Sequence, residues 1–95
     1  IGRGIMTGTV TLFYDQSKGN LLGRLAKLQR EYIDEVIASL HVQLEDNFRM
    51  EALIVQGPAT KLRKIADAMI TCKGVESGKL TLTSINMPPI HSGKD

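Results

Sequence analysis

The chain has 95 residues, of which 42% are hydrophobic, and a chain of this length is expected to form a single small domain around one core. The net charge of +2 is too small to indicate a nucleic-acid binder, and no apolar run approaches the ~20 residues that a membrane-spanning helix needs. A single cysteine, Cys72, excludes an internal disulfide and favours a reducing cytoplasm.

The chain begins with the pattern of a strand and then of a helix. Residues 8–14 alternate in polarity and are rich in β-branched side chains, which is typical of a strand. A cluster of turn residues follows, in which Ser17 or Asn20 could cap a helix. Leucines then recur at helical spacing over residues 21–32, which predicts the first helix.

A hairpin of two strands is predicted next. Residues 36–45 return to a period of two, with apolar and polar side chains on opposite sides. Asp46 and Asn47 are turn formers, and residues 49–56 have the composition of a partner strand. We therefore expect these two strands to pair in antiparallel fashion.

The last part of the chain predicts a second helix and a final strand. The apolar stripe of this helix consists of Leu62, Ile65, Ala66 and Met69. Thr60 is its expected N-cap, and Gly74 stands where a left-handed residue usually ends a helix. Residues 78–84 predict the final strand, with Leu80 and Leu82 facing inward.

The order of these elements predicts an α+β fold of the ferredoxin-like βαββαβ type. Because βαβ crossovers are right-handed, both helices fall on one face of a four-stranded antiparallel sheet. We expect one domain over residues 1–95, with a folded core at residues 8–86, a leading segment at residues 1–7 and a tail at residues 87–95.

The third strand favours an assembly over a monomer. The sheet face without helices should be polar if water wets it, but residues 52–55 are apolar at both parities. Apolar side chains on such a face indicate a protein interface. We predict a homodimer or homotetramer, with an interface formed by Phe13, Ile37, Leu53 and Val55. The alternative is a core strand that the tail covers.

The sequence contains no set of residues that predicts catalysis. His41 and His91 have no acid or nucleophile at a telling spacing, and phosphate-binding loops and Cys-x-x-Cys motifs are missing from the sequence. Cys72 falls near the end of a helix, where an inert thiol is common. We therefore expect a protein that is not an enzyme.

The hairpin carries a resemblance to a known family. Residues 40–44 read Leu-His-Val-Gln-Leu, followed by Arg49 and by Glu-Ala-Leu-Ile-Val-Gln-Gly at residues 51–57. Together with residues 8–14 and residues 65–75, in this order and spacing, they resemble the C-terminal domain of the nickel-responsive transcriptional regulators. The resemblance covers nearly the whole chain.

This resemblance implies an ACT-related ferredoxin-like fold that forms the tetrameric core of a larger regulator. It also implies an upstream ribbon-helix-helix domain, absent here, through which the regulator binds DNA. Residues 1–7 are then expected to be the remnant of the hinge between the two domains, and no membrane partner is expected.

The family's nickel site implies three histidines and one cysteine, with one histidine donated by a neighbouring subunit. Of these ligand positions only His41 matches. Gln43 stands in place of the second strand histidine, Arg49 in place of the cysteine, and Arg30 in place of the neighbour's histidine. Square-planar Ni²⁺ prefers imidazole and thiolate donors, and a cationic guanidinium can neither ligate nor attract it. The sequence therefore disfavours nickel at this position and indicates no other cofactor.

Two interpretations of these residues stay open. Arg30, His41, Gln43 and Arg49 could form an anion or carboxylate site at an interface. Alternatively, the arginines could form ion pairs across the interface with Glu31, Glu35, Glu45 or Glu51. The leading function is a regulatory oligomerisation domain. The alternative is an ACT-like sensor of a small molecule or anion, not tied to metal, with its pocket at residues 15–20 or at an interface.

Overall fold

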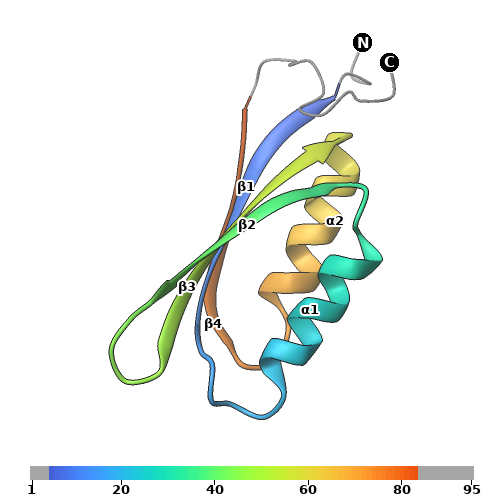
Figure 1. Ribbon diagram of the computed structural model, residues 1–95. Helices are drawn as coiled ribbons and strands as arrows, with labels where there is room; N and C mark the ends of the chain where they lie inside the picture. The colour runs from blue at the N-terminus through green and yellow to red at the C-terminus, as the bar shows by residue number, and fades with distance from the viewer. Residues whose placement is uncertain (1–4, 84–95) are drawn as a thin grey trace.

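The computed structural model describes residues 5–83, and over this range the predicted βαββαβ order is confirmed. The elements are β1 (Met6–Asp15), α1 (Leu21–Glu31), β2 (Val36–Gln43), β3 (Phe48–Gly57), α2 (Ala59–Ile70) and β4 (Val75–Leu82) (Figure 1). Neither of these helices is long and apolar enough to cross a membrane.

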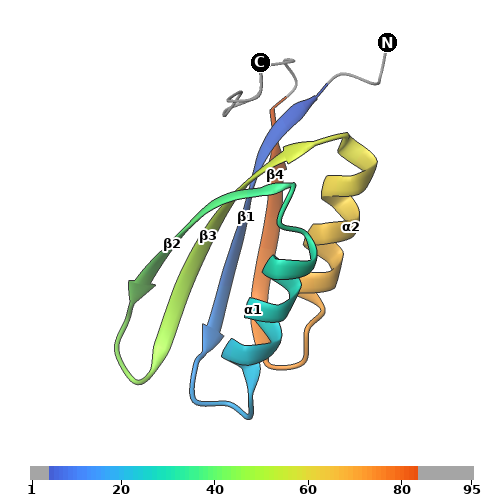
Figure 2. The same ribbon diagram turned by 45° about the vertical axis from the view of Figure 1, so that its right-hand side comes forward.

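The strands form one antiparallel sheet in the order β2-β3-β1-β4. The central strands β1 and β3 pair along their full length, whereas β2 and β4 are the edges. Both helices lie on one face of the sheet and leave the other face open, as two views of the molecule show (Figures 1 and 2). The predicted ferredoxin-like layering is therefore confirmed.

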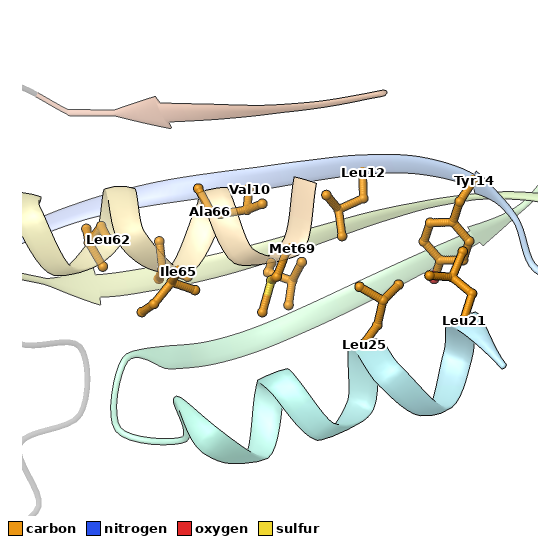
Figure 3. Close-up of a cluster of buried hydrophobic side chains, with 11 residues drawn as sticks. Val10, Leu12, Tyr14, Leu21, Leu25, Leu62, Ile65, Ala66 and Met69 are labelled. Atoms are coloured by element: carbon orange, nitrogen blue, oxygen red, sulfur yellow. The ribbon is translucent and has the colours of Figure 1, made fainter. Parts of the chain in front are cut away.

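The hydrophobic core lies between the helices and the central strands. Its buried members are Val10, Leu12, Tyr14, Leu21, Leu25, Leu53, Val55, Leu62, Ile65, Ala66 and Met69 (Figure 3). All four residues of the stripe predicted for α2 are buried, whereas in α1 only Leu21 and Leu25 are fully buried. Since each large buried side chain stabilises the fold by roughly 1.5–3 kcal/mol, α2 is the more firmly held helix.

The observed edges of the first and last strands differ from the predicted ones. β1 begins at Met6, so Met6 and Thr7 belong to the sheet and not to a hinge. β4 begins at Val75, before Gly78, which the prediction took as its start. A Cβ atom on Gly78 would lie 2.7 Å from Cγ1 of Ile70, so this glycine lets α2 approach the strand. Residues 1–4 and 84–95, which include the predicted tail, lie outside the described residues.

The turn before α1 is closed by a side-chain interaction that the sequence prediction did not include. Asn20 occupies the N-cap position, but its side chain makes no capping hydrogen bond. Ser17 does not cap the helix either, because its backbone N and its hydroxyl both donate to Asp15 Oδ1, at 2.9 and 2.6 Å. These two hydrogen bonds lower the pKa of Asp15 below its ordinary value.

The predicted cap of α2 is also wrong. The helix begins at Ala59 with Pro58 at the N-cap, so Thr60 already lies within the first turn. Proline suits the start of a helix because it lacks the backbone N–H that would find no partner there. Gly74 has the expected left-handed backbone, with φ at +106°.

The β2–β3 hairpin reaches beyond the helices as an arm (Figures 1 and 2). Its turn is confirmed at Asp46 and Asn47, whose φ angles of 56° and 69° lie in the left-handed region that these two residue types tolerate. β2 ends at Gln43, earlier than predicted, and residues 38–47 are all exposed. The arm therefore has little cover within one protomer.

Candidate functional site

The register of the hairpin decides which way its polar side chains face. His41 pairs with Glu51, and Gln43 pairs with Arg49. Glu51 is only 2% exposed and lies beneath the helices, and residues directly opposite in a sheet share a face. The polar side of β2 therefore faces α1, while its apolar side faces outward.

Glu51 is the centre of a buried hydrogen-bond network. Its Oε1 accepts a hydrogen bond from the Tyr14 hydroxyl at 2.6 Å, and its Oε2 accepts one from Gln29 Nε2 at 3.0 Å. His41 Nε2 lies 3.1 Å from the same Oε2. The partners come from β1, α1 and β2, and they supply the pairing that a buried carboxylate requires.

Tyr14 is a firm hydrogen-bond donor in this network. Burial, followed by the hydrogen bond to Glu51, raises the pKa of Tyr14 far above its ordinary value, and the nearby Arg49 charge offsets only part of the rise. The hydroxyl consequently stays protonated at physiological pH and holds the carboxylate of Glu51 in place.

Arg49 lies beside this network, and its guanidinium interacts with the Tyr14 hydroxyl. Its Nη1 donates to Gln16 Oε1 over a long distance of 3.3 Å. Its Nε is buried and has no hydrogen-bond partner within residues 5–83. A guanidinium carries five N–H donors in one plane, so Arg49 retains the capacity to bind an acceptor.

Two adjoining hollows separate α1 from β2, and we call them together the α1–β2 groove. The first, of about 290 Å³, is lined by Leu22, Leu25, Ala26, Gln29, Ser39, His41, Arg49 and Glu51. The second, of about 370 Å³, is lined by Ala26, Gln29, Arg30, Ile33, Val36, Ile37, Ala38 and Ser39. Because Ala26, Gln29 and Ser39 belong to both, the two hollows are continuous.

The structure brings together three of the four predicted site residues. His41 and Arg49 line the first hollow, and Arg30 lines the second. Gln43 does not line either hollow. Its Nε2 donates to the backbone oxygens of Leu44 and Phe48, each at 3.4 Å, so it belongs to the end of the hairpin.

Glu51 and Gln29 are members of this site that sequence reasoning missed. Glu51 was considered only as an ion-pair partner for an arginine. The turn formers Asp46 and Asn47 do not fix this register by themselves, because a two-residue turn there would set His41 opposite Ala52, whereas the observed hairpin sets it opposite Glu51. The contribution of Gln29 depends on how α1 docks, which strand and helix periodicity cannot reveal.

A different hollow includes part of the turn that was the alternative pocket. It has a volume of about 400 Å³ and is lined by Lys18, Gly19, Arg24, Lys73 and Gly74. Arg24 already donates from Nη2 to the backbone oxygen of Lys73 at 2.6 Å, and Asp15 is engaged by Ser17. These groups mainly tie the turn to the end of α2.

The open face of the sheet is apolar over β2, β3 and Phe13 of β1, whereas its other positions on β1 and β4 include Thr9, Thr11, Ser77, Lys79 and Thr81. We call this surface the open-face patch, and by strand parity and register it consists of Phe13, Ala38, Leu40, Val42, Phe48, Met50, Ala52 and Ile54. Leu40 is 65% exposed and Met50 is 38% exposed. The rings of Phe13 and Phe48 stack with their centroids 5.0 Å apart. Large apolar side chains therefore meet solvent on a surface that no described segment covers.

Three of the four residues predicted for the interface are not part of the open-face patch. Leu53 and Val55 are fully buried beneath the helices, because β3 turns that parity toward the core. Ile37 lies at the register shift of β2 and lines the α1–β2 groove. Phe13 is on the open face, as the prediction required.

The fold places the chain among ferredoxin-like domains of the ACT type. It is similar to the ACT domain of a GTP pyrophosphokinase from Chlorobium tepidum, with a TM-score of 0.68 over 80% of this chain and 97% of that one, at 10% identity. An uncharacterized protein from Thermotoga maritima matches 85% of this chain and 98% of its own, with a TM-score of 0.66 at 12% identity. These likenesses concern the fold alone.

The sequence comparisons define the family. Residues 7–83 match the family described as "NikR C terminal nickel binding domain". A candidate nickel-responsive regulator from Pyrococcus horikoshii is 40% identical over 88% of this chain and 61% of its own length. One from Geobacter sulfurreducens is 44% identical over 81% of this chain and 55% of its own length. The chain thus belongs to this family of nickel-responsive regulators and spans about three fifths of the length of such relatives.

The residues at the family's nickel position do not fit nickel. Gln43 is turned to the backbone, Arg49 has no lone pair to offer, and His41 is engaged with Glu51. Cys72 lines a separate hollow with residues of α1. Among residues 5–83, no three side chains of His, Cys, Asp or Glu gather as a metal would require. Residues 5–83 of one protomer therefore do not assemble the imidazole and thiolate set that Ni²⁺ prefers.

Proposed function

We propose that this chain is the regulatory, self-associating domain of a cytoplasmic DNA-binding transcription regulator, and that its copies meet through the open-face patch. Membership of the regulator family supports the regulatory role. Contact with DNA would fall to a ribbon-helix-helix part of the regulator outside this domain, as the resemblance implies. The open-face patch is the observation that carries self-association.

The patch has the properties of a contact surface between proteins. Leu40, Val42 and Met50 are large, adjacent on paired strands and exposed, and exposed apolar clusters of this kind mark interaction sites. Burial stabilises by roughly 25 cal/mol per Å² of apolar surface, and a stable interface buries about 800 Å² on each partner. Contact between the hairpin arms of two copies would bury the apolar side chains of the open-face patch, which are exposed in one protomer.

Light scattering on the purified chain at micromolar concentration tests this proposal. We expect a dimer or tetramer, because the exposed patch favours association. Leu40→Lys should shift the population toward monomer, since a lysine within the contact would be desolvated without a partner. Ile33→Lys is the matched control, because Ile33 is 67% exposed but lies off the patch. A wild-type monomer at this concentration would contradict the proposal.

We further propose that nickel is not the effector at the family position. Arg49 lies in place of a thiolate and Arg30 in place of an imidazole, and both would repel a divalent cation. Metal analysis of protein purified without a histidine tag should find nickel far below one equivalent. Stoichiometric nickel would overturn this part of the proposal.

A variant that rebuilds the family ligands makes the nickel test sharper. Arg30→His, Gln43→His and Arg49→Cys, combined in one chain, restore the imidazole and thiolate donors that the resemblance implies. We expect this triple variant to take up nickel under conditions in which the wild type does not. Equal nickel content in the two proteins would show that these positions do not control the metal.

A further inference from the structure

We propose that the α1–β2 groove binds a small carboxylate or related oxyanion, with the guanidinium of Arg49 as its principal contact. Ser39, Gln29 and His41 are the neighbouring polar groups. Only the role of the bound anion as an effector rests on the proposed function. Its binding can be measured without reference to assembly or DNA.

The first argument is the state of Arg49. Its guanidinium donates to Gln16 over 3.3 Å and interacts with the Tyr14 hydroxyl, but its buried Nε has no partner among the described residues. Buried N–H groups without partners are rare in folded proteins, and each calls for an explanation. A planar guanidinium matches the geometry of a carboxylate through two parallel hydrogen bonds. An acceptor in the groove would use the Nε donor that the described residues leave without a partner.

The second argument is that Glu51 forms no direct ion pair with Arg49 within residues 5–83. Both carboxylate oxygens of Glu51 are engaged by Tyr14, Gln29 and His41. Within the described part of the chain, the recorded ion pairs are His41 with Glu51 and Lys61 with Glu35, so neither involves Arg49.

The charge along the groove also favours an anion. Arg49 lies in the first hollow and Arg30 in the second, against the single carboxylate of Glu51. The two arginines and the one carboxylate alone give the groove a net positive charge. Its electrostatics therefore oppose a metal cation and favour an oxyanion.

The walls of the groove favour an organic carboxylate over an inorganic ion. Leu22, Leu25 and Ala26 of α1 form an apolar wall opposite the polar groups. Pockets for small molecules combine apolar walls with a few converging polar groups. A short aliphatic dicarboxylate fits this pattern, because its carbon chain can contact the wall while a carboxylate reaches Arg49.

Titration of the isotope-labelled chain with succinate and, separately, with inorganic phosphate tests the proposal. NMR reports directly on the Nε–Hε signal of each arginine. We expect the Arg49 signal to shift saturably with succinate, and phosphate to shift it with a higher dissociation constant. Stronger binding of phosphate would retain the oxyanion site but overturn the preference for an organic ligand.

Two variants separate a specific site from general charge effects. Arg49→Gln should weaken succinate binding by at least about tenfold, since charge-assisted hydrogen bonds are the strong ones. Arg63→Gln, on the exposed side of α2, should leave binding unchanged. Arg49→Lys keeps the charge but loses the planar fork, so an intermediate loss is expected.

Three results would overturn the proposal. These are an Arg49 signal that does not saturate, equal shifts at all arginines, and wild-type affinity in Arg49→Gln. If Arg49→Gln fails to fold, the wild-type Nε–Hε titration decides the matter alone. Light scattering on the same samples keeps the two proposals apart: an assembled chain without a shift removes the groove site, whereas a monomer that binds succinate removes the assembly.

Discussion

Apolar side chains lie on both faces of the sheet along β3, but the helices cover only one of these faces (Figure 2). On β3, Leu53 is fully buried beneath the helices, whereas the next residue, Ile54, points to the open face. On β2, Leu40 of the open face is 65% exposed. The composition of the strands does not distinguish these faces. Only the placement of both helices on one side makes one face a core and leaves the other exposed.

The covered face is itself divided into two parts. Under α2 and the first half of α1 it is a packed apolar core (Figure 3). Toward the hairpin arm the sheet diverges from α1, and there the covered side carries Ser39, His41 and Arg49. Polar side chains occur where the helix no longer seals the sheet, so the groove is a consequence of incomplete packing that ligand chemistry can use.

The largest expected effect compares neighbouring residues on opposite faces. Leu53→Ala should lower the free energy of unfolding by about 2–5 kcal/mol, because it opens a cavity in the core. Ile54→Ala should cost clearly less in the dissociated protomer, since Ile54 is only half-buried there. Urea denaturation at several protein concentrations separates the protomer from the assembly. Equal losses at low concentration would contradict the distinction between the faces.

The next effect concerns the polar network at the boundary between core and groove. Tyr14→Phe removes the hydroxyl that donates to Glu51 Oε1 and leaves that buried carboxylate short of a donor. We expect a loss of about 1–3 kcal/mol in the free energy of unfolding. Tyr32→Phe is the matched control, because Tyr32 is only half-buried, and it should change stability by no more than about 0.5 kcal/mol. Similar losses of unfolding free energy in the two variants would show that the Glu51 network does not stabilise the fold.

The same tyrosine predicts a dependence on high pH. The pKa of Tyr14 is raised in the folded protein, so the folded state holds this proton more tightly than the unfolded state does. In the unfolded state a tyrosine has a pKa of about 10. The contribution of protonated Tyr14 to the free energy of unfolding is fully present below about pH 10. It is lost as the pH rises further, by at most about 1.4 kcal/mol per pH unit. Denaturation curves above and below this pH should show the decline in the wild type and a shallower one in Tyr14→Phe. An equally steep decline in both proteins would show that the Tyr14 hydroxyl does not cause this pH dependence.

The smallest effect on stability belongs to the open face. Leu40→Lys should change the free energy of unfolding of the dissociated protomer by only about 0.5 kcal/mol, because an exposed side chain loses little packing. At higher protein concentration the wild type should gain stability through association, and the variant should not. A large loss at low concentration would show that Leu40 supports the fold of the protomer itself.

The sequence alone determined the elements, their order and much of the hairpin. The helical stripe of α2 and the turn at Asp46 and Asn47 were predicted correctly, because periodicity and turn chemistry are local properties. The same turn also placed Arg49 on the strand paired with that of His41. The resemblance at residues 40–57 also indicated the family that the comparisons establish.

The tertiary structure alone decided which side of each strand is covered. A period of two shows that Leu53 and Ile54 face opposite ways, but not which of them meets the helices, and for this reason the predicted interface included the wrong parity of β3. Docking of α1 likewise brings Gln29 to Glu51 and leaves the groove open beside Arg49. These contacts join residues far apart in the chain, and they follow from how the layers pack, which no local pattern contains.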